Sequence, residues 1–444
     1  MTIGLTSVDG LSAGNAHHVR EVLGRSILAD GLDLVLDLDR SGGSYLVDAR
    51  DGGRYLDMFT FFASSALGMN HPALTDPVFR AELAQVAVNK TSNSDIYTVP
   101  MACFVQTFAR VLGDPELPHL FFVDGGALAV ENALKVAFDW KSRLNESRGI
   151  DPALGTRVLH LRGAFHGRSG YTMSLTNTDP NKVARFPKFD WPRIEAPVMA
   201  PGVDIVALER ESLRQARAAF EAYPHDIACF IAEPIQGEGG DRHIRAEFFA
   251  AMRDLCLEFD ALLIFDEVQT GCGLTGTPWA YQQLGVTPDV VAFGKKVQVC
   301  GVMAGGRVDD IADNVFQVSS RINSTWGGNL TDMVRARRIL EVIEADGLID
   351  NAVRLGWYLV GQLRCLAGEF PSLVLDPRGR GLMCAFSMPS AGQRDELLQR
   401  LWERRVILLP SGVDSVRFRP ALTVSRAEID EAVQAVREVL RTLE

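Results

Sequence analysis

The sequence contains few cysteines and no two of them in a CxxC spacing. Seven cysteines are scattered among 444 residues, and such an odd set suits neither a disulfide framework nor a zinc site. No stretch approaches the roughly 18 consecutive apolar residues of a membrane span, and the first basic residue, Arg20, follows a segment without a signal-peptide pattern. These absences predict a cytoplasmic protein that has reduced thiols, binds no metal and does not enter a membrane.

The chain also lacks a cluster of basic residues. Its 45 lysines and arginines are outnumbered by 56 aspartates and glutamates, which gives a net charge of −11. This balance argues against nucleic acid as a partner. What is present, 47% hydrophobic and 23% charged residues, is typical of a globular protein, and the length predicts about two or three domains.

Short apolar runs of strand length alternate with helical stretches from about residue 117 onward. The runs lie at 119–123, 158–161, 227–232, 261–265 and 290–293. This alternation predicts an α/β domain whose sheet is largely parallel.

The two ends of the chain follow other patterns. Residues 1–42 are predicted to be rich in loops, with one short helix near 18–28, and a hairpin is predicted from segments 45–48 and 54–58. Residues 329–369 predict either one long helix or a broken pair. A C-terminal α+β region follows, with strands predicted at 373–375, 382–387, 406–409 and 415–419 and helices at 394–404 and from 426.

Two segments place reactive side chains directly after predicted strands. Asp266 follows five apolar residues, so it lies at the strand edge where α/β proteins bind ligands, although it could equally cap the next helix. Lys295 and Lys296 follow another strand, where apolar walls would favour the free amine. An exposed pair of lysines is the alternative.

A third segment has Gly125 and Gly126 between a strand and a helix. Glycines there let the backbone approach an anion, and the helix N-terminus offers free amides, so the segment could bind phosphate or could be a simple turn. It is not a G-x-G-x-x-G sequence, which argues against a nicotinamide dehydrogenase. Other polar segments are weak signals singly: His166 could be a core histidine, and Glu233 and Glu238 could belong to a solvated loop.

Taken in order, the motifs resemble those of the class III pyridoxal-phosphate aminotransferases over nearly the whole chain. The set consists of the double glycine before an A-V-E helix, F-H-G-R at 165–168, E-P-I-Q-G-E-G-G at 233–240, D-E-V-Q-T-G at 266–271, G-K at 294–295, S-T-x-G-G-N at 324–329 and R-F-x-P at 417–420. The resemblance implies the α/β fold type I of pyridoxal-phosphate-dependent transferases, which is aspartate-aminotransferase-like. It also implies an N-terminal arm with part of the small domain at 1–60, a large cofactor domain at 61–330 and a small α+β domain at 331–444.

The resemblance assigns pyridoxal 5′-phosphate as the cofactor. Lys295, preferred over Lys296, matches the lysine that forms the Schiff base, and Asp266 matches the carboxylate that pairs with the pyridine nitrogen. The remaining cofactor contacts implied are ring stacking by Phe165, a ring-oxygen contact by Gln269, phosphate binding by the backbone of Gly126 and Ala127, and phosphate binding in the partner subunit by Thr325. That last role implies a homodimer. Ala127 departs from the serine of many relatives, so one hydroxyl donor to phosphate is missing.

The same resemblance implies the substrates. Arg168 would bind a carboxylate far from the reacting carbon and Arg417 one close to it, while Glu238 would cover Arg417 when the amine donor is bound. Segments 162–171, 293–303 and 323–332 most resemble the lysine 6-aminotransferases of the family, which implies L-lysine and 2-oxoglutarate as substrates. Asn323 is a candidate for donor recognition.

Other functions stay open. A 4-aminobutyrate or ornithine aminotransferase has similar motifs, and a non-catalytic binding protein could keep the same scaffold.

Overall fold

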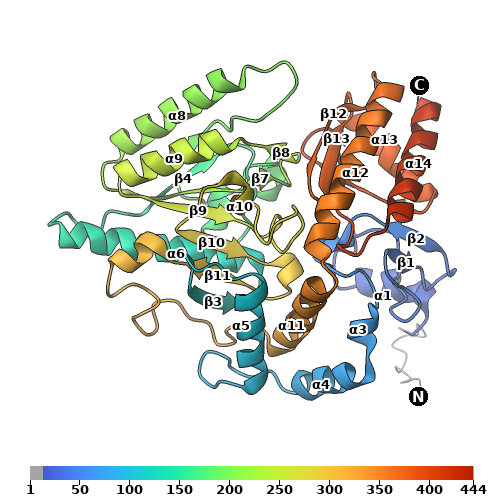
Figure 1. The fold of residues 1–444 in the computed structure, drawn as a ribbon, viewed down its shortest axis with the longest axis horizontal. Coiled ribbons are helices and arrows are strands. Elements are labelled where there is room, and N and C mark those ends of the chain that lie inside the picture. The colour runs from blue at the N-terminus through green and yellow to red at the C-terminus, as the bar shows by residue number, and fades with distance from the viewer. Residues whose placement is uncertain (1–13, 444) are drawn as a thin grey trace.

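The computed structural model describes residues 14–443, in which a seven-stranded sheet forms the centre of the larger part (Figure 1). The sheet contains, in spatial order, β3 (His119–Val123), β11 (Cys300–Ala304), β10 (Val290–Phe293), β9 (Leu262–Asp266), β6 (Ile227–Ala232), β4 (Arg157–Leu161) and β5 (Arg193–Ile194). Only β11 runs antiparallel to its neighbours β10 and β3. The predicted α/β fold with a largely parallel sheet is therefore confirmed.

Helices cover both faces of this sheet. Alternate residues of β9 point to opposite faces: Leu262 and Ile264 share an apolar cluster with α6 (Gly126–Ser147), whereas Phe265 packs edge-on against Phe249 of α9 (Ala246–Glu258). Helices α9 and α8 (Ile205–Ala222) lie on one side of the sheet and α6 on the other (Figure 1). This double covering explains why the strands read as continuous apolar runs.

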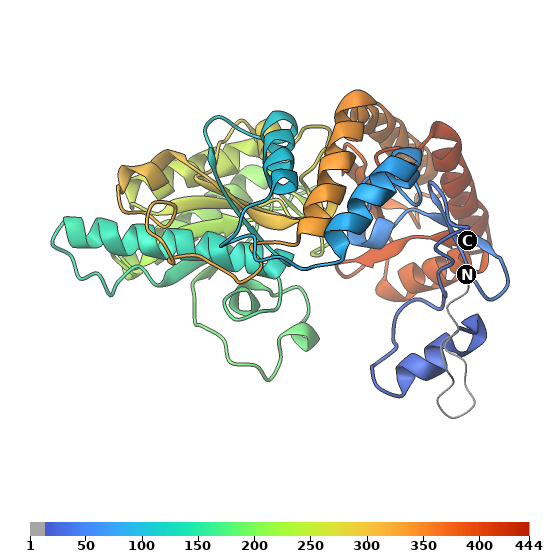
Figure 2. The same cartoon turned by 90° about the horizontal axis from the view of Figure 1, so that it is seen from below.

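The two ends of the chain build the second, smaller part together. Strands β1 (Tyr45–Val47) and β2 (Arg54–Asp57) form the predicted hairpin, and β14 (Val406–Ile407) pairs parallel with β2. A separate sheet contains β12 (Leu375–Arg380), β13 (Met383–Ser387), β16 (Ser415–Phe418) and β15 (Leu409–Ser411). Figure 2 shows the N-terminal segments, in blue, beside the red C-terminal ones.

Helices α11 (Leu330–Ala345) and α12 (Leu348–Glu369) connect the two parts, so the long helical segment is a broken pair. The break is at Gly347, which takes a left-handed conformation with φ 59°. Helix α11 packs against α4 (Pro77–Ala87) and α5 (Val99–Val111), whereas α12 packs against β12. The domain boundaries at residues 60 and 330 stay predictions.

The strand predictions differ from the structure in several places. The strand predicted at 373–375 begins only at Leu375, because the amides of Leu373 and Val374 both bond to the Phe370 carbonyl in a turn after α12. The strand predicted at 406–409 is divided between β14 and β15, which belong to different sheets. Strand β11 was not predicted, since Gly301 interrupts its short apolar run. The predicted C-terminal helices are confirmed as α13 (Ala391–Glu403) and α14 (Arg426–Leu443). The remaining elements are Ala16–His18, α1 (Val19–Gly24), α2 (Thr60–Ala63), α3 (Pro72–Thr75), α7 (Thr172–Leu175), Pro180–Lys182, β7 (Ile235–Gln236), β8 (Arg242–His243), α10 (Tyr281–Leu284), Lys295–Val297 and Gly306–Asp310.

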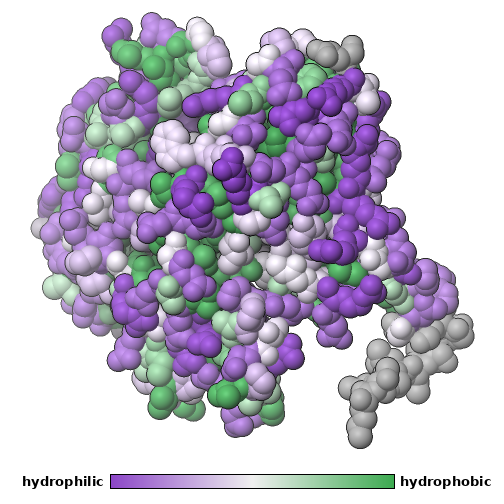
Figure 3. All heavy atoms as spheres, turned by 45° about the vertical axis from the view of Figure 1, so that its right-hand side comes forward, coloured by the Kyte–Doolittle hydropathy of each residue, from purple (hydrophilic) through white to green (hydrophobic). Residues whose placement is uncertain are grey.

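None of the helices formed by the described residues is long and apolar enough to cross a membrane. The face in Figure 3 is mostly hydrophilic, and its hydrophobic side chains form separate patches. Between residues 14 and 443, no three His, Cys, Asp or Glu side chains are grouped so that they could hold a metal ion.

Candidate active site

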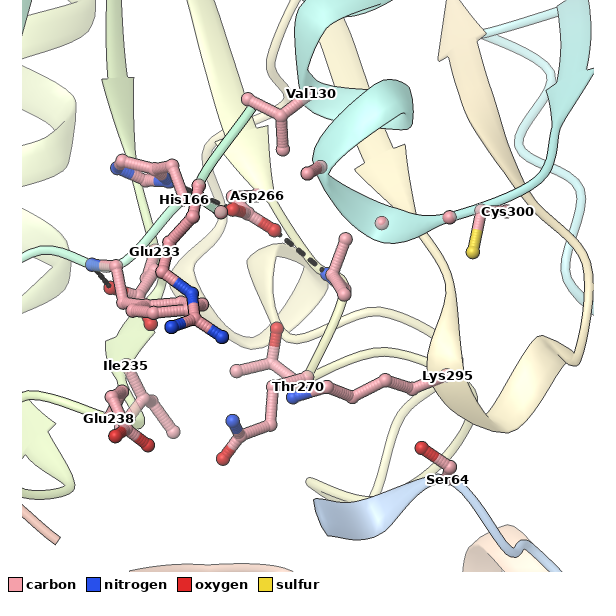
Figure 4. Close-up of a pocket in the computed structure, with 18 of the residues that line it drawn as sticks. Ser64, Val130, His166, Glu233, Ile235, Glu238, Asp266, Thr270, Lys295 and Cys300 are labelled. Carbon is pink, nitrogen blue, oxygen red and sulfur yellow. Dashed lines mark hydrogen bonds and ion pairs between the residues drawn. The ribbon is translucent and has the colours of Figure 1, made fainter. Parts of the chain in front are cut away.

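The carboxyl ends of the parallel strands meet around one cavity of about 570 Å³. The cavity is lined by residues at or after the ends of five different strands. These are Gly126 and Ala127 after β3, Phe165 to Arg168 after β4, Glu233 after β6, Asp266 and Gln269 at and after the end of β9, and Lys295 after β10. Chain segments far apart in sequence converge there because parallel strands end at the same edge of a sheet. Figure 4 shows Lys295, Asp266 and Glu238 directed into this cavity from different elements.

The structure separates the two adjacent lysines. Lys295 lines the cavity, and its burial together with the nearby charge of Arg417 lowers the pKa of its ammonium group to about 8. Lys296 is buried elsewhere, where its Nζ donates a hydrogen bond of 2.7 Å to the carbonyl of Ala63. Only Lys295 is therefore placed to react with a molecule in the cavity.

Asp266 is held by two hydrogen-bond donors. His166 Nδ1 lies 2.8 Å from its Oδ2, and the amide of Val268 donates to its Oδ1 at 3.1 Å. Both side chains are buried, so the carboxylate is fixed in one orientation at the end of β9. His166, read from the sequence as a possible core histidine, is thus part of the site.

Glu233 is a second buried carboxylate, whereas its sequence context alone suggested a residue of a solvated loop. Its oxygens accept hydrogen bonds from the amides of Phe165 at 2.9 Å and Gly237 at 3.0 Å. Burial raises the pKa of Glu233 to about 7. The Glu233 side chain thus connects the F-H-G-R loop to the loop that carries Glu238. In the sequence, the position of Glu233 directly after an apolar strand was the feature that could have indicated a site residue.

The N-terminus of α6 forms one wall of the cavity. Gly125 precedes the helix with φ 105°, and no acidic residue occupies the first turn, so the free amides of this turn can meet an anion. The loop that carries Gly167 comes very close to this first turn of α6. A Cβ on Gly167, whose φ is 111°, would lie 2.5 Å from the Cβ of Ala127. Glycine is required there because any side chain would collide with the helix start.

Two arginines reach the site from the C-terminal part of the chain. Arg417 of β16 is buried, and its Nη2 lies 3.1 Å from Glu238 Oε2. Among residues 14–443, Arg417 Nε has no hydrogen-bond partner, so this guanidinium keeps a donor for a bound carboxylate. Arg419, also buried, pairs with Asp241 and donates to Gln269 Oε1 at 3.1 Å.

The other predicted residues differ in position. Arg168 lines the cavity and, within the described range, forms no ion pair. Asn323 and Thr325 are exposed on a loop and do not line the cavity of their own chain. The structure therefore places the predicted site residues around the cavity except for these two and Arg417, which does not line the cavity but contacts the lining residue Glu238.

A left-handed helical turn, α2, lies beside the site, since Ser64, the residue that follows it, lines the cavity. Its four residues, none of them glycine, have φ between 44° and 67°, and such a turn costs about 1–2 kcal/mol per residue. The turn is held by Asp57, which accepts the amides of Phe59 and Thr60 at 2.8 Å. Further contacts come from the Thr60 hydroxyl, which donates to the Arg419 carbonyl at 2.6 Å, and from Lys296 at the Ala63 carbonyl.

Comparison with known proteins gives consistent matches over the chain. The model of the family described as aminotransferase class-III matches residues 28–440. The L-lysine-epsilon aminotransferase of Mycobacterium tuberculosis is 76% identical over 426 residues, covering 95% of each chain, and that of Amycolatopsis lactamdurans is 59% identical over 431 residues, again 95% of each. A solved structure of lysine aminotransferase from M. tuberculosis in the internal aldimine form superimposes with a TM-score of 0.96, at 74% identity, over 97% of this chain and 100% of that chain.

Proposed function

We propose that this chain, which belongs to the class III aminotransferase family, transfers the ε-amino group of L-lysine to 2-oxoglutarate. The products would be 2-aminoadipate 6-semialdehyde and L-glutamate, formed in a ping-pong cycle at one site. Proteins named L-lysine-epsilon aminotransferase are 59–76% identical to it over 95% of its length. The cavity supports this activity because it combines an amine of lowered pKa with a fixed carboxylate and Arg168, while Arg417 contacts the lining residue Glu238.

The cofactor of the family is pyridoxal 5′-phosphate, and the cavity residues fit it. The α6 N-terminus offers amides for the phosphate, Lys295 offers an amine for covalent attachment, and Asp266 offers a fixed carboxylate for the ring nitrogen. When bound, the cofactor supplies an electron sink for the pair left when a proton leaves the carbon that bears the amine.

The residues then have separate tasks. Asp266 would keep the ring nitrogen protonated, with His166 fixing the carboxylate. Gln269, held by Arg419, would lie near the ring oxygen, and Phe165 would stack on the ring. Lys295, once released from the cofactor, would carry the proton away from the ε-carbon of the substrate, and its lowered pKa makes the free amine available near neutral pH.

Two arginines let one site accept two substrates. Arg168 would bind the α-carboxylate of lysine or the far carboxylate of 2-oxoglutarate, and Arg417 the carboxylate beside the ketone. The Glu238–Arg417 ion pair of 3.1 Å would cover Arg417 while lysine is bound, so that an α-carboxylate cannot bind there and present the wrong amine. Glu238 would leave Arg417 when the keto acid enters.

We further propose a homodimer in the cytoplasm. Thr325 is exposed on a loop outside the cavity of its own chain, and that position leaves it available to a partner subunit's phosphate. The proposed role of Asn323 in donor recognition would require the same arrangement.

An absorbance scan of the purified holoenzyme tests the activity. L-lysine, 4-aminobutyrate and L-ornithine are added in turn without keto acid, and the spectrum reports conversion of the cofactor to its aminated form. Conversion by L-lysine at the highest kcat/KM is the expected result. Faster conversion by 4-aminobutyrate or L-ornithine would assign a sister activity instead, and a protein without a visible chromophore would contradict the enzyme class.

A further inference from the structure

Glu238 contacts a second cation besides Arg417. Lys182 Nζ donates a hydrogen bond of 2.6 Å to Glu238 Oε1, while Arg417 Nη2 lies 3.1 Å from the other oxygen, Oε2. Although burial alone would raise the pKa of Glu238, Arg417 and Lys182 together hold it below its ordinary value. The carboxylate is therefore shared between two positive charges, one on each oxygen.

The two cations lie in different surroundings. Arg417 is 4% exposed on a strand of the C-terminal part, whereas the side chains of Lys182 and Glu238 are 26% and 27% exposed. Lys182 ends the short 3-10 helix Pro180–Lys182 and lines a neighbouring cavity of about 510 Å³ but not the candidate active site. Glu238 lines both cavities, so its carboxylate has space on the Lys182 side into which it can turn away from Arg417.

We propose that Lys182 is a positioning residue that retains Glu238 when this carboxylate releases Arg417 to 2-oxoglutarate. Without Lys182, release of Arg417 would leave the partly buried Glu238 carboxylate without a cationic partner, and an unpaired charge in such a place costs free energy. With Lys182 present, Glu238 gives up one of two charged contacts and moves toward the neighbouring cavity. This inference rests on the proposed exchange of amine and keto-acid substrates at one site.

A further contact places Lys182 beside the cofactor region. Its Nζ lies 5.5 Å from the centre of the Phe165 ring, within the range of a cation–π interaction. Phe165 is anchored in turn by Glu233 through its amide. Lys182 therefore has neighbours on two sides, the Glu238 carboxylate and the Phe165 ring.

The test separates the two half-reactions by stopped-flow absorbance of the holoenzyme. In Lys182→Gln the charge is removed while a hydrogen-bond donor is kept on a side chain one bond shorter. The apparent KM for 2-oxoglutarate should rise about tenfold, the size expected for one lost charged hydrogen bond, while the half-reaction with L-lysine keeps its wild-type constants. Lys182→Arg should restore most of the affinity for the keto acid.

Two control variants separate the contact with Glu238 from a general effect of charge. Lys188→Gln makes the same change of charge in the same loop, where Lys188 Nζ donates hydrogen bonds to the nearby carbonyls of Val183 and Phe186, and it should leave both half-reactions unchanged. In a Glu238→Gln background, Lys182→Gln should have no further effect on the KM for 2-oxoglutarate, because no charge remains to be retained.

Three results would overturn the inference. An unchanged KM for 2-oxoglutarate in Lys182→Gln would show that Lys182 has no such role, and an equal loss in both half-reactions would indicate a structural role. An effect of Lys182→Gln that persists in the Glu238→Gln background would indicate direct attraction of the substrate anion. Failure of the proposed function would look different. In that case wild-type enzyme would not react with L-lysine, yet the keto-acid half-reaction of Lys182→Gln could still be compared with wild type after amination by another donor.

Discussion

His166 Nδ1 lies 2.8 Å from Asp266 Oδ2, and both side chains are buried. The two residues follow strands β4 and β9, which are separated in the sheet by β6. The pair therefore fixes a carboxylate at the centre of the cavity from two independent parts of the chain.

Removing this partner should slow catalysis. His166→Ala is expected to lower kcat with L-lysine about tenfold to a hundredfold, because a hydrogen bond to a charged group contributes about 1.5–3 kcal/mol. His166→Asn places an amide donor near the Nδ1 position and should recover part of the loss. Single-turnover kinetics measure both, and wild-type kcat in His166→Ala would show that Asp266 needs no help from this histidine.

The adjacent lysines should respond differently to substitution. Lys295→Ala should abolish covalent attachment of the cofactor and lower kcat by about 10²–10⁴-fold, since it removes the proposed base. Lys296→Met leaves the Ala63 carbonyl without its partner and should cost about 1–3 kcal/mol of stability, while the cofactor still attaches. Visible absorbance and thermal unfolding distinguish the two, and loss of the chromophore in Lys296→Met alone would reverse the assignment.

Attachment of the cofactor should depend on pH through Lys295. Its pKa in the cofactor-free protein is lowered from 10.5 to about 8, and only the unprotonated amine attacks an aldehyde. The rate at which apoenzyme takes up pyridoxal 5′-phosphate should therefore rise with pH, with a midpoint near pH 8. A midpoint near the value of an ordinary lysine would show that burial and Arg417 do not act on this amine.

Uncovering Arg417 should change donor selectivity. Glu238→Ala removes the carboxylate that pairs with this guanidinium, so donors that present an α-amine beside a carboxylate should gain about tenfold in kcat/KM, the value of one charged hydrogen bond. The 2-oxoglutarate half-reaction should be preserved. Equal ratios of ε- to α-amine turnover in wild type and variant would contradict the role of Glu238.

Arg168 should matter to both substrates. Arg168→Gln is expected to raise the KM for L-lysine and for 2-oxoglutarate about tenfold to a hundredfold, because each would lose a carboxylate contact. Arg162→Gln is the matched control, since within residues 14–443 the Arg162 side chain forms an exposed ion pair with Glu195, and such pairs contribute little. A KM change confined to one substrate would assign Arg168 to that substrate alone.

The sequence predicted the parts of the site that depend on one strand and its end. Asp266, Lys295 and Gly126 each lie within three residues of the end of an apolar run, so the strand pattern alone placed them at one edge of the sheet. Choosing between Lys295 and Lys296 required the family resemblance, because both follow the same strand and only the fold turns Lys296 toward Ala63.

Contacts between distant loops could not be predicted in this way. Lys182 lies 56 residues before Glu238, in a short 3-10 helix without a pattern of its own, and Glu233 joins two loops through backbone amides that any sequence provides. The left-handed turn at 60–63 has no glycine or asparagine to indicate it. These features exist because tertiary packing selects conformations that local preference does not favour.

That turn also limits how the enzyme can be re-engineered. Its Ala63 carbonyl accepts a hydrogen bond from the side chain of Lys296, next to Lys295, and its Thr60 hydroxyl donates one to the Arg419 carbonyl. The distance between the amine and Arg417 therefore depends on three separate stretches of chain at once. A chimera designed to accept another donor should transplant residues 57–64, 294–298 and 417–419 as a unit, because replacing one stretch leaves the others fitted to a turn that no longer forms.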